Sequence, residues 1–185
     1  MAEYQNLFTS VQVAALTTAQ AAALSTGQVA ALTTAQLSSL VSDDLNALTT
    51  TQIRALNSAQ IGSLTTSQVS TLETADVAAL TTGQIAALNS AQLGALSTDG
   101  IVALTSTQVA ALNSVQVAGL STTQIQAIES GDLRALGTAA LRALSTAQLE
   151  ALGSDQIGAL GTGQVAALTT GQIAGLVSDD LNALT

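Results

Sequence analysis

The chain has 185 residues, of which 48% are hydrophobic, and 12 acidic residues against three basic ones give it a formal net charge of −9. Cysteine and histidine are absent, which excludes disulfides, thiolate or imidazole metal sites, and Ser/His or Cys/His nucleophile pairs. The basic residues are the arginines Arg54, Arg134 and Arg142, too few to neutralise phosphates, so we expect no binding to nucleic acid or to an anionic membrane surface.

Residues 1–8, MAEYQNLF, precede a repeat and are interpreted as a lead-in or possible cap, with Tyr4 and Phe8 as candidate lid residues. They lack the basic and apolar regions of a secretory signal. No apolar run approaches the length of about 20 residues that a membrane span needs, so we expect no membrane insertion. Localisation stays open between the cytoplasm and an extracellular or surface location reached by a non-classical route.

Residues 9–185 form an array of 22 octapeptide repeats without insertion or deletion. Every eighth residue from Phe8 to Leu184 is Leu, apart from Phe8 itself and Ile128, and we number each octad from this residue as position 0. Position 2 is Ser or Thr in all 22 octads, position 4 is Gln in 16, position 5 is aliphatic, and position 7 is small. The array contains no domain boundary or linker, which predicts one solenoid domain.

An eight-residue period fits neither a continuous helix nor a flat strand. Eight residues at about 100° each leave a drift of roughly 80° per octad, which would spread the leucines around a helix. In a strand, positions 0 and 5 would point to opposite faces because they differ in parity. A β-solenoid with corners could still place both inward and remains the alternative fold.

A short capped helix in each octad accounts for most of the restricted positions. With the N-cap at position 1, Gln at position 4 falls at N3 and completes a capping box, while positions 0 and 5 form a hydrophobic staple. Such helices are too short to be stable alone, so they must stack. The sequence therefore predicts an all-α solenoid with one very short helix per octad.

Three further expectations concern the stacking. The small residue at position 7 should let the next segment approach closely, and the hydroxyl at position 2 should bond backbone in a neighbouring octad. The Asn N-caps Asn57, Asn89 and Asn113 follow no superperiod, which indicates that the octads occupy equivalent environments. The number of octads per coil stays open.

The phrases LTTGQIAAL (80–88) and LTSTQVAAL (104–112) resemble the opening of transcription activator-like effector repeats, LTPxQVVAI, which forms a first short helix in that family. That resemblance supports the helix register, but the second helix and the base-reading loop of those repeats have no counterpart here. The array also resembles the short Leu/Thr/Gln/Ala octapeptide tracts of large repetitive bacterial surface or secreted proteins, whose function is uncertain.

Octads that depart from the repeat pattern are the candidate positions for a functional site. Asp replaces Gln at position 4 in four octads, and only there is position 1 Val or Glu; the pairs are Val41 with Asp44, Glu73 with Asp76, Glu129 with Asp132, and Val177 with Asp180. We interpret these aspartates as compensating by charge for a missing N-cap. Calcium binding at the two SDD sequences (42–44 and 178–180) would need more oxygen ligands than two adjacent carboxylates supply.

Acid and base catalysis by Glu73 with Asp76, or by Glu129 with Asp132, is not expected, because nothing aromatic or basic lies near in sequence to shift a pKa, and solvated helix starts are predicted. Arg134, Arg142 and Glu150 share position 6 in consecutive octads and suggest a solvated row of charge or a partner patch. We expect no catalytic, cofactor or metal residues, no cofactor, and no enzyme activity.

The function expected from these features is structural: a scaffold, a spacer or a filament subunit that binds further copies of itself end to end. The last octads repeat a phrase from the middle of the chain, VSDDLNALT, so no specialised cap is expected there, with a charged stop at Asp179 and Asp180 as the rival interpretation. The alternative from another class is a module that presents regular Ser and Thr rows to ice, carbohydrate or protein. Nucleic-acid binding by analogy with the effector repeats is the least favoured.

Overall fold

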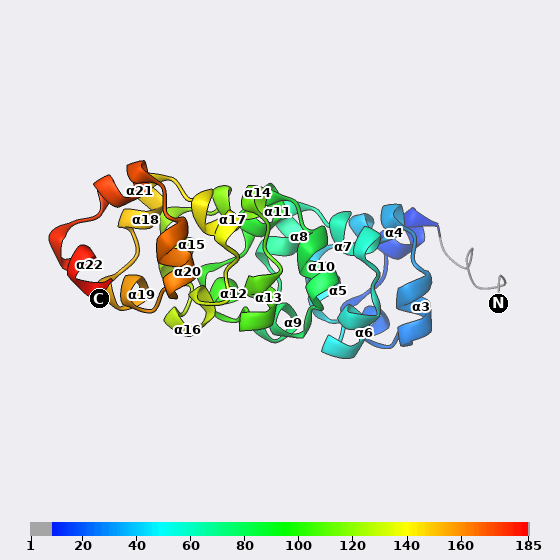
Figure 1. Cartoon of the computed structure of the whole chain (residues 1–185). Coiled ribbons are helices and arrows are strands. Elements are labelled where there is room, and N and C mark those ends of the chain that lie inside the picture. The colour runs from blue at the N-terminus through cyan, green and yellow to red at the C-terminus, as the bar shows by residue number, and fades with distance from the viewer. Residues whose placement is uncertain (1–8, 185) are drawn as a thin grey trace.

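The computed structural model describes residues 9–184, and these residues form 22 short helices and no strand. The all-α prediction is confirmed and the β-solenoid alternative is wrong. The lead-in at residues 1–8, with Tyr4 and Phe8, lies outside the described residues, so its role as a cap stays a prediction. The helices stack into an elongated rod in which α3 and α4 lie near one end and α22 lies at the other (Figure 1).

The helices begin at position 2 of every octad, as follows: α1 Ser10–Ala14, α2 Thr18–Ala22, α3 Thr26–Ala31, α4 Thr34–Ser39, α5 Ser42–Asn46, α6 Thr50–Ala55, α7 Ser58–Gly62, α8 Thr66–Ser70, α9 Thr74–Ala79, α10 Thr82–Ala87, α11 Ser90–Ala95, α12 Thr98–Val102, α13 Ser106–Ala110, α14 Ser114–Ala118, α15 Thr122–Ala127, α16 Ser130–Leu133, α17 Thr138–Arg142, α18 Thr146–Glu150, α19 Ser154–Gly158, α20 Thr162–Ala167, α21 Thr170–Gly175 and α22 Ser178–Ala183.

Two to four residues separate successive helices, and the last two of them, at positions 0 and 1, are extended where a six-residue helix precedes them. Leu80, at position 0, has φ −57° and ψ 139°, and the following N-cap Thr81 has φ −74° and ψ 160°. No residue of the described chain has a positive φ. Because L-residues adopt the extended region freely, the chain turns at each octad without a glycine or proline hinge.

The capping box has the predicted register. Wherever Ser, Thr or Asn at position 1 is followed by Gln at position 4, both bonds of the box are present. In α10 the N–H of Thr81 donates to Gln84 Oε1 at 2.7 Å, and the N–H of Gln84 donates to Thr81 Oγ1 at 3.2 Å. Each of these helix starts therefore satisfies two of its free backbone donors locally.

Stacking between coils relates each helix to the third one after it. The contacts run α1 to α4, α2 to α5, and onward to α19 with α22. Backbone and side-chain atoms bonded between coils belong to residues 25 to 31 positions apart. One coil therefore takes between three and four octads, the quantity that the sequence left open.

Positions 0 and 5 build one continuous core along the described array. Leu80 is 4% exposed and Ile85 is fully buried, and the same holds for their counterparts in the middle octads. Medium-sized aliphatic side chains from both positions fill the interior of the rod. The hydrophobic staple predicted from sequence is thus also the solenoid interior.

The small residues at the end of each octad allow close approach, as predicted. A Cβ added to Gly119 in α14's C-cap would lie 2.7 Å from Ser90 Cβ, at the start of α11. Some position 2 hydroxyls bond between coils: Ser58 Oγ donates to the carbonyl oxygen of Gly83 at 3.1 Å, and Ser114 Oγ to that of Ala139 at 3.0 Å. The acceptor lies three octads onward rather than in the adjacent octad, because that is the octad stacked above.

Candidate functional site

The position 4 glutamines connect one coil to the next through the buried core. Gln84 Nε2 in α10 donates to the carbonyl oxygens of Ile53 at 2.9 Å and Leu56 at 2.8 Å, at the end of α6. The same amide's Oε1 accepts the N–H of its own N-cap. The amide of Gln84 therefore accepts a backbone N–H at the start of its own helix, and it donates to backbone carbonyl oxygens at the end of the helix four before it.

This arrangement recurs along the rod, and we call it the glutamine ladder. Its members are Gln52, Gln60, Gln68, Gln84, Gln92, Gln108, Gln116, Gln124, Gln148, Gln156, Gln164 and Gln172, each donating to the Leu or Ile carbonyl 28 residues earlier. That carbonyl lies in the extended link between helices, where no helical N–H can reach it. Each ladder bond contributes about 1 kcal/mol, and leaving the carbonyl buried without a donor costs about 1–3 kcal/mol.

Sequence reasoning identified the capping function of these glutamines and missed the ladder. A signal was present, because a capping box accepts Glu as readily as Gln at N3, yet position 4 is never Glu in this chain. The carboxylate could serve the cap but could not donate to the carbonyls of the earlier helix. The choice of Gln and never Glu, in 16 octads, thus marks a second hydrogen-bonding role.

The aspartates at position 4 are more buried than the sequence predicted. Asp44, Asp76 and Asp180 are 2%, 3% and 4% exposed, so the solvated helix start predicted for the pair of Glu73 and Asp76 is wrong for Asp76. Burial, with a smaller effect from Glu73, raises the pKa of Asp76 from 3.8 to about 6. Burial, with a smaller effect from Asp43, also raises the pKa of Asp44. The prediction that nothing shifts a pKa in the pair of Glu73 and Asp76 is therefore wrong for Asp76, because it considered neighbouring side chains and not desolvation.

The aspartates also interrupt the ladder. Oδ2 of Asp44 is buried without a hydrogen-bond partner. Asp132 Oδ1 accepts the hydroxyl of Ser106, and Asp180 Oδ1 accepts that of Ser154 at 3.0 Å. The helices that carry the four aspartates have no side-chain N-cap bond, as the Val or Glu at position 1 predicted. At Asp76 burial outweighs the favourable effect of the helix N-terminus on a carboxylate, since the pKa rises.

The acidic residues considered in the sequence for metal binding or catalysis lie in or directly before four separate helices, α5, α9, α16 and α22. Within residues 9–184 no group of three or more acidic side chains could hold a metal ion. Glu129 lines an open surface hollow of about 470 Å³ together with Asp155, whereas Asp132 does not line it and is bonded to Ser106. No helix of the described part of the chain is long and apolar enough to cross a bilayer.

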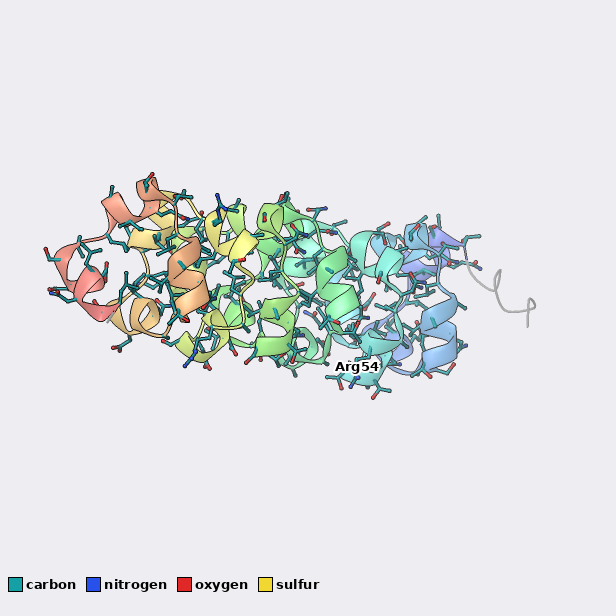
Figure 2. The ribbon with its side chains drawn as sticks, viewed as in Figure 1. Arg54 is labelled. Atoms are coloured by element: carbon teal, nitrogen blue, oxygen red, sulfur yellow. The ribbon has the colours of Figure 1, made fainter. Side chains whose placement is uncertain are left out.

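The charged residues at position 6 are exposed, as expected for a solvated face. Arg134 is the C-cap of α16, and Arg142 and Glu150 lie in the next two helices, α17 and α18. Because helices stack on the third one after them, these three residues lie in different stacks and do not form a row along the rod. Arg54, in the last turn of α6, projects at the periphery (Figure 2).

The first coil of the described array leaves its glutamine amides open. The helices α1, α2 and α3 have no helix three before them within residues 9–184. Gln12 and Gln20 are exposed and Gln28 is half-buried, whereas Gln84 is 2% exposed. Their Oε1 atoms accept the N-cap N–H bonds as in every other octad. Their Nε2 donors have no partner within the described residues.

The last coil leaves the other half of the same interface open. The helices α20, α21 and α22 have no helix three after them in the described chain, and their position 5 side chains are uncovered. Ile173 is 42% and Leu181 44% exposed, and Val165 is half-buried, whereas Ile157 one octad earlier is fully buried. The carbonyl oxygens of Leu160, Leu168 and Leu176 accept no hydrogen bond within residues 9–184. Of the two aspartates predicted as a charged stop, Asp180 is buried against Ser154, whereas Asp179 is exposed.

A continuous core, one capped helix per octad and a repeating bond between coils define a tandem-repeat protein of the α-solenoid class. The ALTTAQ repeat family matches residues 37–74, 69–106 and 125–162, which together make up more than half of the chain. The chain therefore belongs to the ALTTAQ repeat family. No curated protein gives a significant match.

Proposed function

We propose that the chain is a structural protein without catalytic activity, a scaffold or spacer that extends by end-to-end stacking into a filament. The observation that carries this proposal is the pair of open coil faces. Ile173 and Leu181 occupy positions that are fully buried in the middle of the rod, and they lose that cover only because no later coil follows within the described chain.

The burial of apolar side chains that holds one coil on the next also favours the stacking of a second molecule on the end of the first. Covering two or three aliphatic side chains removes apolar area from water, worth about 25 cal/mol per Å². The contact joins unlike ends, so it does not close, and repeated addition gives a linear polymer. The uninterrupted core also supports a stiff spacer, because buried apolar side chains pack against one another along the described length.

The experiment is sedimentation of the purified chain over a range of concentrations, with electron microscopy of the same samples. Moderate salt is needed, because a net charge of −9 makes copies repel one another at low ionic strength. We expect the mean mass to rise with concentration and the particles to lengthen at constant width. A monomer at every concentration would contradict the filament and leave the spacer.

A further inference from the structure

We propose that copies of this chain join head to tail in one register, in which the glutamine ladder continues across the joint. Helices α1, α2 and α3 of one copy stack on α20, α21 and α22 of another, and Gln12, Gln20 and Gln28 donate to the carbonyl oxygens of Leu160, Leu168 and Leu176. This inference rests on the proposed function, and it names the partner, the polarity and the bonded atoms.

The register follows from the bonds inside the rod. Each ladder glutamine donates to the Leu or Ile that follows the helix four before it, as Gln172 in α21 does to Leu144 at 2.9 Å. Inside the rod each helix stacks on the one three before it, so α1 of a second copy stacks on α20 and takes the position directly after α22. The helix four before that position is α19. The position 0 residue after α19 is Leu160, and the same step assigns Leu168 to Gln20 and Leu176 to Gln28.

Donors and acceptors are matched in kind and number at the two faces. The first coil offers three amide groups whose Nε2 atoms have no partner in the described chain, and the last coil offers three carbonyl oxygens that accept no bond there. The apolar parts match as well, since Leu16 and Leu24 are half-buried in the first coil while Ile173 and Leu181 are exposed in the last.

The polar bonds select against the opposite polarity. A joint between two first coils would bring amide donors against amide donors, and a joint between two last coils would bring carbonyl oxygens together. Either would bury polar groups without partners, which is costly, whereas the head-to-tail joint satisfies both sets. The apolar contacts alone would not impose this choice, because aliphatic packing is not directional.

The first test replaces Gln12, Gln20 and Gln28 together by Glu. Each Glu keeps the oxygen that accepts the N-cap N–H, so the first helices remain capped, but it removes the donor and places a carboxylate against a carbonyl oxygen. We expect the association constant to fall at least tenfold at fixed salt, with an unchanged helical spectrum. The charge-matched control replaces the exposed side-face residues Ser67, Thr107 and Thr123 by Glu, and it should assemble like the parent chain.

The second test determines the register of the joint from disulfide formation between introduced cysteines. The chain has no cysteine of its own, so no other disulfide can form. Inside the rod, Ser63 Oγ lies 3.4 Å from the carbonyl oxygen of Thr34, at the start of the helix three before. The corresponding pair across the joint is Ala23 of one copy and Thr170 of the other. Mixing an Ala23→Cys copy with a Thr170→Cys copy should give the mixed disulfide dimer, and a Thr34→Cys, Ser63→Cys chain serves as the internal positive control.

The outcomes separate this inference from the proposed function. If the parent chain does not assemble at all, the proposed function is wrong and the inference with it. If the parent assembles and the triple Glu variant assembles equally well, or if the disulfides form only between two Ala23→Cys copies, the filament stands and the head-to-tail ladder is overturned. A mixed disulfide together with loss of assembly in the Glu variant supports both.

Discussion

The Nε2 atom of Gln84 lies 2.8 Å from the carbonyl oxygen of Leu56, 28 residues earlier in the chain, and this bond ties the start of α10 to the end of α6. Both groups are buried, since Gln84 and Leu56 are 2% and 3% exposed. The bond recurs along the rod and joins a local helix cap to the packing of coils. The stability of the solenoid should therefore depend on the amide itself.

Replacing Gln84 by Glu is expected to lower the free energy of unfolding by about 2–4 kcal/mol at pH 7.5, because a carboxylate then faces two buried carbonyl oxygens. Urea denaturation followed by circular dichroism measures the change. The matched control is Gln12→Glu, whose amide is exposed and bonds no earlier coil, and we expect a change within about 0.5 kcal/mol. Equal effects at the two sites would contradict the ladder.

Thr81→Ala should cost about 1 kcal/mol, because Thr81 Oγ1 accepts the N–H of Gln84 at 3.2 Å and an alanine leaves that donor free. Thr81→Asn should be nearly neutral, because Asn89 Oδ1 makes the same bond to the N–H of Gln92 at 2.9 Å in the next octad. Thermal unfolding of the two variants provides the comparison. Similar losses for Ala and Asn would show that the hydroxyl does not act as the cap.

Leu88→Ala should cost about 2–4 kcal/mol, since Leu88 is 2% exposed and its removal leaves a cavity on the axis of the rod. Val115, at 70% exposure, supplies the control, and Val115→Ala should change stability by less than about 0.5 kcal/mol. Chemical denaturation of both variants measures the difference. A negligible effect at Leu88 would contradict a core built from position 0.

Gly119→Ala should destabilise the rod by about 1–3 kcal/mol, because the added Cβ would lie 2.7 Å from Ser90 Cβ in the coil below. Gly163→Ala is the control, since nothing lies within 4 Å of its added Cβ and alanine favours the helix by about 1 kcal/mol. Opposite signs are therefore expected in thermal unfolding. A stabilised Gly119 variant would mean that the coils are further apart than described.

Asp76→Asn should stabilise the protein at pH 7.5 by up to about 3 kcal/mol and should do so less as the pH falls. The pKa of Asp76 is raised in the folded state from 3.8 to about 6, so the folded chain binds the proton more tightly than the unfolded chain. This carboxyl therefore contributes stability below pH 3.8, and the contribution is lost as the pH rises through 6. Urea denaturation of both chains from pH 4 to 7.5 measures the difference in their free energies of unfolding. A difference that does not vary with pH would show that Asp76 does not titrate in this range.

The sequence alone determined everything that is local to one octad. The helix starts at position 2, the N-cap at position 1, and the capping box and staple follow from residues at most five positions apart, which a periodic pattern displays directly. The missing side-chain caps at Val41, Glu73, Glu129 and Val177 were readable for the same reason.

Only the tertiary structure decided the relations between coils. The stacking of each helix on the third one after it, the ladder from Gln84 to Leu56 and the burial of Asp76 all depend on the rotation from one octad to the next. Because the octads are nearly identical in sequence, none of them indicates which distant octad it contacts. Stacking on the second, third or fourth octad along the chain would fit the repeat pattern equally well. That rotation is set by how the side chains at positions 0, 5 and 7 pack together, and packing is a property of neighbours in space.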